Sequence, residues 1–515
     1  MTIEIKNEFK NELCIICEQA AYKQFNLIFK GGCVASCILS IMLFTLVFTI
    51  TILCYVLIHT KFFNKSYWKK KNVVQTDYNL MLKFIFGKQS MPEILKDIYD
   101  DHPDALYVGT IAGTTPTLIL KHPEDIQAVL AGDFQSFHSR GIKFGPHDLL
   151  ADNLLFMNDV KRWKLLRNKL SPVFTTFKLK YMFKIIEKVA RDFVEVVEDD
   201  IHLRQNPFNI LYTYTTASIG ASVFGIDTQN NRNAMDSPFL EMTKKTLEPS
   251  LYANIAALIA NSSPKLYDFL NIKVFGEHEE FFIGAVRAVL EERKRTTVRT
   301  HDFIDLCLGL QLHGYMHDFT TNYSLEPTVE VLAAQAFFFF LAANTMHYTL
   351  IELSNNPEVL AKVHEEIDRV FEECNEQFTY DEVEKLQYLD QVINEAMRKY
   401  PTIGVIQRLC TKNTVLPSGV AIDKDDIVMI SPFALHRDEK YFPEPDKYDP
   451  ERFSPENVSK IPKYVYGFAR LQVKAGLAWL LRRFTLGEQN CTPKFERSPF
   501  GLRSPTDRYE LKLRD

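Results

Sequence analysis

The pattern of hydrophobic and polar positions separates one long apolar run near the N-terminus from the rest of the chain. Residues Cys33–Ile58 contain no charged side chain. A bilayer span needs about 20 apolar residues, and this run is longer. A buried core helix is rarely apolar on every face over such a length, and a cleaved signal peptide does not follow a polar stretch carrying four acids. The pattern therefore predicts a transmembrane anchor over 31–60, preceded by an N-terminal extension, residues 1–30.

Charges on either side of the run predict its orientation. Before the run, lysines are balanced by glutamates, whereas after it the nearest charges are all basic: Lys61, Lys65, Lys69, Lys70 and Lys71. Basic flanks stay on the cytoplasmic side of a membrane. We therefore expect the large C-terminal part to lie in the cytosol.

The pattern after the anchor is mainly helical. The segment 105–130 predicts two short strands around a Gly-Thr-Thr-Pro turn, followed by a helix that opens at Pro123 and Glu124. Helical spacing follows over 159–197, broken at Ser171-Pro172, and over 207–295, with loops near 227–237 and 261–264.

The second half continues this alternation. A long helical stretch over 328–371 is interrupted at Asn355-Asn356-Pro357, and another helix covers 379–399. A hairpin over 413–430 turns at Pro417-Ser418-Gly419. A final helix covers 468–484. With no internal repeat or Gly/Ser linker, residues 72–515 are predicted to form a single large domain, mainly α with a minor β part.

Composition narrows the class of protein. Among 515 residues, 60 basic and 65 acidic side chains give a net charge of -5, which argues against a nucleic-acid partner. The 39 Phe and 22 Tyr suit a large aromatic core or an apolar pocket. Nine irregularly spaced cysteines argue against a disulfide framework and for a reducing compartment. Cys14 and Cys17 form a C-x-x-C, but no second Cys or His pair stands at zinc-site spacing.

Two charged motifs stand out on predicted helices. Glu395 and Arg398 lie three residues apart on an otherwise apolar helix, so they can meet and be partly buried, or form an ordinary surface pair. Trp163 and Arg167 lie one turn apart, and both donate hydrogen bonds to anions. The alternative for each is an ordinary surface or packing role.

Several segments together resemble the cytochrome P-450 family, most closely its microsomal insect type. Glu395-Ala-Met-Arg398 is similar to the family's E-x-x-R, Pro450-Glu-Arg-Phe453 to its P-E-R-F, and Trp163-Lys-Leu-Leu-Arg167 to its W-x-x-x-R. The segments "SFHSRG", "FIDLCLGL" and "AAQAFFFFLA" are also similar to family segments. The likeness extends from about Tyr107 to the end of the chain.

The resemblance implies a haem monooxygenase of the endoplasmic reticulum membrane. Such an enzyme oxidises small lipophilic compounds with oxygen and electrons from NADPH–cytochrome P-450 reductase. By resemblance, Arg452 joins Glu395 and Arg398 in a structural triad. Trp163, Arg167 and Arg408 would bind the haem propionates.

One departure concerns the haem ligand. In the family, the segment F-x-x-G-x-R-x-C-x-G directly precedes the last long helix, and its cysteine thiolate binds iron. Here Gly467 continues directly into Phe468, without that cysteine. Cys410, Cys491 and His436 are poor substitutes, because each stands in a different part of the family pattern. No residue is therefore assigned as a metal ligand.

A second departure lies in the family's oxygen-activating helix, A-G-x-D/E-T-T. This chain has Leu341-Ala-Ala-Asn-Thr345, without the acid. The stretch is shorter by about five residues, which would rotate the following turns by roughly 140°. Thr345 is the candidate for the catalytic threonine, or is merely a helix residue.

Two interpretations remain open. The chain is by family a haem-thiolate monooxygenase that is impaired or inactive as written. Alternatively, it is a membrane-anchored relict without catalysis, or the product of a skipped exon or defective gene model. Neither the substrate nor the oligomeric state follows from the sequence.

Overall fold

The computed structural model describes most of the chain after the predicted anchor. The described residues are 67–205, 207–225, 251–262, 264–296, 302–337, 345–461, 471–487, 493–498, 501–502 and 509–514. The chain divides into two compact units between Lys65 and Ser66, and the described residues all belong to the second. The predicted span Cys33–Ile58 and the N-terminal extension lie outside them.

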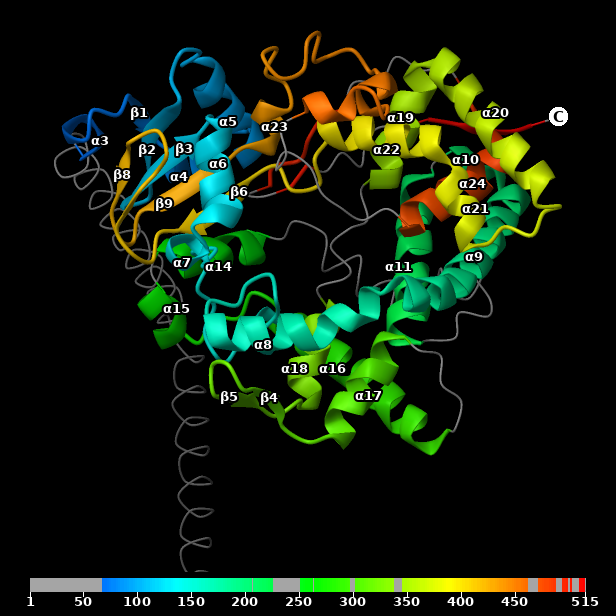
Figure 1. The fold of residues 1–515 in the computed structure, drawn as a ribbon, viewed down its shortest axis with the longest axis horizontal. Coiled ribbons are helices and arrows are strands. Elements are labelled where there is room, and N and C mark those ends of the chain that lie inside the picture. Colours follow the sequence, from blue (N-terminus) through cyan, green and yellow to red (C-terminus); the bar gives the residue numbers. More distant parts are fainter. Residues whose placement is uncertain are drawn as a thin grey trace, which may run out of the picture. The chain divides into compact units, whose positions relative to one another are not determined.

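A five-stranded sheet forms the β part of this unit, in the order β1-β2-β3-β9-β6 (Figure 1). The strands are β1 (Gln75–Asn79), β2 (Tyr107–Ala112), β3 (Thr115–Leu120), β9 (Ile427–Ile430) and β6 (Ile406–Leu409). β2 and β3 form the predicted hairpin, while β3 pairs in parallel with β9 and β9 pairs antiparallel with β6.

The hairpin predicted over 413–430 is only partly confirmed. Its arms are β7 (Thr414–Val415) and β8 (Ala421–Ile422), which meet around the predicted turn, where Gly419 has a φ of 89°. Ile427–Ile430 instead joins the large sheet as β9. All four residues of β9 are buried, so burial between two sheet neighbours determines where this segment lies.

Short helices surround the sheet. They are α3 (Tyr67–Lys70), α4 (Leu80–Phe86), α5 (Met91–Asp100), α6 (Pro123–Gln127), η2 (Ala128–Gly132), α7 (Phe134–Phe137) and α23 (Pro432–Leu435). The α5 helix begins with a capping box between Ser90 and Glu93 and has Pro at its start. As predicted, α6 begins at Pro123.

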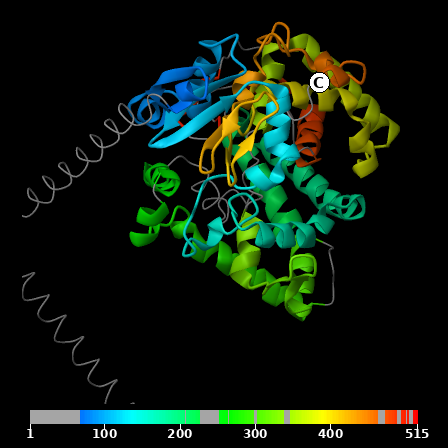
Figure 2. The ribbon, with the colours of Figure 1, turned by 60° about the vertical axis from the view of Figure 1, so that its left-hand side comes forward.

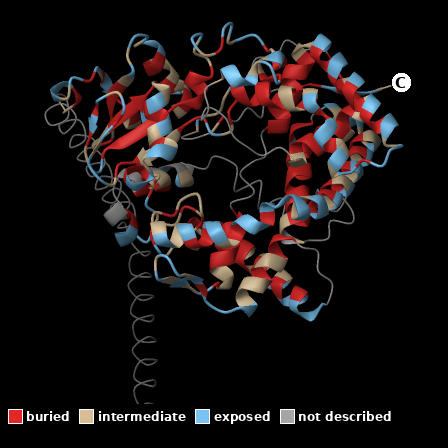
Figure 3. Cartoon of the chain, viewed as in Figure 1, coloured by how far each residue is buried: buried red, intermediate tan, exposed pale blue. Residues whose placement is uncertain are grey.

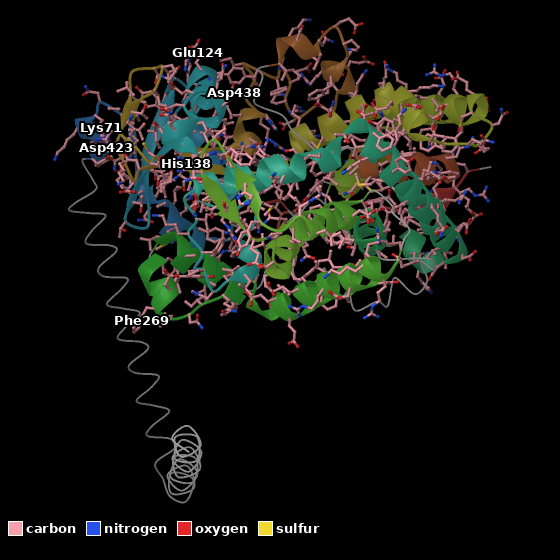
Figure 4. All side chains as sticks on the ribbon, turned by 60° about the horizontal axis from the view of Figure 1, so that its bottom comes forward. Lys71, Glu124, His138, Phe269, Asp423 and Asp438 are labelled. Atoms are coloured by element: carbon pink, nitrogen blue, oxygen red, sulfur yellow. The ribbon has the colours of Figure 1, made fainter. Side chains whose placement is uncertain are left out.

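The first described residues are fixed to this sheet. Trp68 is fully buried, and its indole N–H donates to the carbonyl of Thr110 at 3.0 Å. A Cβ on Gly109 would lie 2.3 Å from the Trp68 ring, so a glycine is required there. Lys71 Nζ lies 2.8 Å from an Asp423 carboxylate oxygen, and Figure 4 shows both residues together at the edge of the unit.

Helices make up the rest of the unit. Before the central region these are α8 (Val160–Leu170), η4 (Ser171–Phe174), α9 (Thr176–Asp199), α10 (Ile201–Gln205), α11 (Phe208–Phe224), α14 (Leu251–Ser262), α15 (Pro264–Phe269), α16 (Gly276–Arg295), α17 (Phe303–Leu312) and α18 (Val329–Phe337). The predicted break at Ser171-Pro172 is the short 3-10 turn η4. A small hairpin, β4 (Met316–Asp318) and β5 (Tyr323–Leu325), contacts α8.

The C-terminal helices pack into the largest hydrophobic cluster. These elements are α19 (Thr345–Asn355), α20 (Pro357–Glu373), α21 (Tyr380–Lys385), α22 (Gln387–Lys399), η6 (Pro450–Phe453), η7 (Val458–Lys460), α24 (Leu471–Arg483), β10 (Phe484–Leu486) and β11 (Leu511–Leu513). Buried side chains of α9, α11, α19, α20, α22 and α24 make up most of the cluster. Figures 1 and 2 show these helices opposite the sheet, and Figure 3 shows buried residues along their inner faces.

Two predicted helix limits are corrected. The stretch 379–399 is two helices, because fully buried Leu386 leaves the helical conformation between α21 and α22. Asn261 belongs to α14, so the loop predicted over 261–264 is shorter than expected. No helix in the described part of the chain combines the length and the apolarity needed to cross a bilayer.

Candidate functional site

A fully buried ion pair connects α22 to the loop before η6. Both side chains, Glu395 and Arg398, have no exposed surface, and two of the Arg398 nitrogens donate to the two carboxylate oxygens at 2.7 and 2.9 Å. Arg398 also donates to the carbonyls of His436 at 2.6 Å and Pro445 at 2.7 Å. The three-residue spacing on one helix makes this contact possible.

Arg452 approaches the same carboxylate. Its Nε lies 3.4 Å from Glu395 Oε1, and its Nη2 donates to the carbonyl of Glu444 at 3.0 Å. The backbone N–H of Asp449 also donates to Glu395 Oε1, at 3.0 Å. Burial raises the pKa of Glu395, and the hydrogen bond and charge of Arg398 act in the opposite direction. The structure thus brings together the three residues of the predicted triad.

Arg408 lies on β6, opposite the segment "SFHSRG", in which the sequence prediction named no individual residue. Ser139 and Leu409 form an antiparallel bridge, and Leu409 N–H donates to Ser139 O at 2.8 Å. Gln407 Nε2 donates to the carbonyl of Arg140 at 3.2 Å. This ladder places Arg140 opposite Arg408. The next residue, Gly141, has a φ of 79°, and a Cβ there would lie 2.9 Å from Gln407 Nε2.

Arg167, on α8, contributes a third positive charge, so we call Arg140, Arg167 and Arg408 the arginine cluster. Burial first, and then the charges of Arg408 and Arg167, lower the pKa of Arg140 to about 10. Burial also lowers the pKa of Arg408. In the part of the chain that is described, no carboxylate within 4.0 Å forms an ion pair with any of the three. The cluster can therefore receive an anion.

Two of the predicted anion ligands make other contacts in this structure. Trp163 donates its indole N–H to the carbonyl of Leu154 at 3.2 Å. The guanidinium of Arg167 lies 5.2 Å from the centre of the Trp163 ring, a cation–π distance. Arg167 thus packs on the face of the indole, and the indole N–H already donates to Leu154.

Thr345 is the first described residue of α19 and is buried. Its Oγ1 lies 3.4 Å from the Thr402 hydroxyl. The residues before it, 338–344, lie outside the described residues, and so does the predicted position of the missing acid. The catalytic role of Thr345 stays a prediction.

The described cysteines all have environments that favour the thiol over the thiolate. Burial raises the pKa of Cys307 and Cys374, and raises that of Cys410 to about 11. Cys410 also donates its S–H to the carbonyl of Lys412 at 3.0 Å. His436 is buried, with its Nδ1 3.0 Å from the carbonyl of Arg398. Cys491 and the junction Gly467–Phe468 lie outside the described residues.

These observations test whether the chain fits the haem that the resemblance implies. The arginine cluster fits the two propionates, because it is positive and without an acidic partner among the described residues, with Arg140 and Arg408 half-buried and Arg167 exposed. The iron has no assigned ligand, because the sequence has no cysteine where Gly467 continues into Phe468, and the described thiols have raised pKa values. The residues present therefore match one edge of the cofactor but not its iron.

Comparison with known proteins agrees with the motifs. The profile of the cytochrome P-450 family matches residues 81–513. The chain is 31% identical over 455 residues to cytochrome P-450 6B7 of Helicoverpa armigera, covering 84% of this chain and 85% of that protein. It is 30% identical to cytochrome P-450 6A1 of Musca domestica, over 82% and 88% of the two chains. Identity to cytochrome P-450 6B1 of Papilio polyxenes is 32%, over 78% and 82%.

Proposed function

This chain belongs to the cytochrome P-450 family, and we propose that it is a membrane-anchored member whose monooxygenase activity is impaired. Members of the family are haem-dependent monooxygenases that act on lipophilic substrates with electrons from a reductase. When bound, haem supplies the iron that activates oxygen. This chain would be anchored in the endoplasmic reticulum membrane with its folded unit in the cytosol.

The framework around the cofactor supports the family part of the proposal. Glu395, Arg398 and Arg452 would hold α22 against the loop before η6. The arginine cluster would bind the propionates. These groups act on the edge of the cofactor and on the fold, so they can persist in a chain that has lost its chemistry.

The absence of a cysteine where the family has its iron ligand is the single observation that carries the impairment, because Gly467 continues directly into Phe468. A thiolate ligand needs a lowered thiol pKa, and positive neighbours usually provide it. Cys410 has the opposite environment: burial and the charges of Asp426, Asp133 and Asp423 all raise its pKa. The sequence also lacks a cysteine between Gly467 and the start of α24.

A spectroscopic experiment tests the proposal. The full chain is expressed in membranes with haem supplied, then reduced and exposed to carbon monoxide. We expect no absorbance band characteristic of thiolate-ligated iron. Such a band, lost in Cys491→Ser or Cys410→Ser, would overturn the proposal and identify the ligand.

The alternative is a non-catalytic relict or a defective gene model. The gap falls inside one motif while the flanking residues remain similar to the family, as a skipped exon would produce. Sequencing the transcript across the Gly467–Phe468 junction distinguishes the two. A transcript encoding the missing segment would restore the ligand cysteine to the natural protein.

A further inference from the structure

The first two residues of α3 hold this short helix against the folded unit. Trp68 is fully buried, and its indole N–H donates to the carbonyl of Thr110 on β2 at 3.0 Å. The Tyr67 hydroxyl lies 2.8 Å from a carboxylate oxygen of Asp423 and 2.8 Å from one of Asp426. Figure 1 shows α3 at the outer end of the sheet, beside β1. The fold therefore determines which side chains of α3 face solvent.

Three successive lysines complete and follow α3, and they are of two kinds. Lys71 is partly buried and its charge is already paired. Its Nζ lies 2.8 Å from a carboxylate oxygen of Asp423 and 3.0 Å from the Tyr67 hydroxyl. Lys69 and Lys70 are exposed, and neither forms an ion pair within 4.0 Å with a carboxylate in the part of the chain that the structure describes. Their two charges are available to an external anion.

This exposed pair stands close to the predicted anchor. The charge-free run Cys33–Ile58 ends nine residues before Tyr67, and the only charged residues between them are Lys61 and Lys65. Nine residues reach at most roughly 30 Å, so the length of the chain alone keeps α3 near the end of the run. Acidic lipids of the cytoplasmic surface attract basic residues directly beside a membrane span. The exposed pair on α3 fits that chemistry.

We propose that Lys69 and Lys70 bind the anionic headgroups of the bilayer that holds the predicted anchor. This inference rests on the membrane-anchored part of the proposed function and adds the class of ligand, an acidic phospholipid. Lys71 is excluded from this role, because its ammonium group is paired with Asp423. Since Trp68 fixes α3 to β2, lipid binding at α3 would restrict how the folded unit can turn on its tether.

The test uses the full chain in discs of phosphatidylcholine that contain a photoactivatable phosphatidylserine as the probe. After illumination, mass spectrometry measures the yield of lipid crosslinked to residues 67–74. We expect a higher yield than with photoactivatable phosphatidylcholine, and we expect the difference to disappear at high salt, which screens exposed charges. The double variant Lys69→Gln, Lys70→Gln should lower the yield about twenty- to thirtyfold, the combined attraction of an acidic membrane surface for two basic side chains.

Lys71→Gln is the matched control, because it removes the neighbouring lysine charge from the same segment. We expect it to lower the urea midpoint of unfolding, since Asp423 and buried Asp426 lose their counter-ion. Its crosslinking yield should equal that of the parent. The double variant should show the opposite pattern, with the urea midpoint of the parent and a low yield. The two measurements thus distinguish lipid binding from a structural role.

Three outcomes would overturn the inference: equal yields from the two photoactivatable lipids, an unchanged yield in the double variant, or a loss in Lys71→Gln as large as in the double variant. Extraction of the membranes with alkaline carbonate tests the anchor separately. A chain released by carbonate would overturn the membrane-anchored part of the proposed function, and with it the premise of this inference. A chain that is retained but gives no crosslink at α3 would overturn this inference alone.

Discussion

Replacing Gly476 by alanine tests how α24 is seated immediately after the shortened motif. A Cβ on Gly476 would lie 2.4 Å from Tyr214 Cε1 on α11 and 2.9 Å from Met346 Cε on α19. The Tyr214 ring cannot easily move away from the added methyl group. It is buried, its hydroxyl donates to the carbonyl of Gln472 at 2.7 Å, and the Phe193 ring lies 5.0 Å away. One added methyl group must therefore displace a helix.

The expected loss of stability follows from two opposing effects. Overpacking a rigid core costs about 1–3 kcal/mol, and the fixed ring favours the upper end. Alanine recovers about 1 kcal/mol of helix propensity relative to glycine. The net prediction for Gly476→Ala is a loss of about 2 kcal/mol in the free energy of unfolding.

Pulse proteolysis across a urea series measures this difference on the full chain. Gly284→Ala is the matched control: it makes the same change inside α16, where nothing lies within 4 Å of the new Cβ. That variant should be neutral or slightly more stable. In a Tyr214→Leu background, Gly476→Ala should lose most of its cost, because the clashing ring is gone. Equal urea midpoints for Gly476→Ala and Gly284→Ala would refute the close packing of α24 against Tyr214 and Met346.

Three further predictions concern buried ionisable groups. Glu395→Gln should cost about 3–5 kcal/mol by leaving Arg398 buried without its counter-ion, whereas Lys362→Ala, which removes a solvent-exposed partner of Glu451, should change urea midpoints little. Cys410 should resist iodoacetamide at pH 8 in the folded chain and react after denaturation, because its pKa is raised to about 11; rapid labelling would contradict this. The pKa of His364 is lowered to about 4 by burial and by Arg514, so the stability it contributes is complete above its ordinary pKa and is lost as the pH falls from 6.5 towards 4. His364→Gln should flatten that loss, and an unchanged pH profile would argue against the prediction.

Local patterns predicted most of the helices and the first hairpin, because their signals lie within a few residues. The division between α21 and α22 escaped prediction for the opposite reason. Glu366, on α20, accepts the backbone N–H groups of Tyr388 and Leu389 at 2.8 and 2.9 Å, so the start of α22 is capped from another helix. Such a cap has no local signature. Strand β9 was misassigned likewise, since its partner β3 lies in the first quarter of the chain.

Those residues of the candidate site that stand in recognisable sequence motifs could be predicted. Glu395, Arg398 and Arg452 were named from the sequence, and the structure brings them together. Arg140 was missed, although it stands in the quoted segment "SFHSRG". Its only local signal is the glycine that follows, whose positive φ lets this segment lie against β6. Arg140 becomes part of the candidate site only because it lies opposite Arg408, which is far away in the sequence.

The pairing of β3 with β9 also implies a delay during synthesis, because the two strands are far apart in the sequence. Thr117 faces Ile427, about 310 residues later in the chain. At typical ribosomal speeds, roughly 15 to 60 s separate the emergence of these two strands. Throughout that interval the apolar edge of β3, with Leu118, Ile119 and Leu120, has no strand to cover it. This edge of β3 therefore stays unpaired until the C-terminal third of the chain is made.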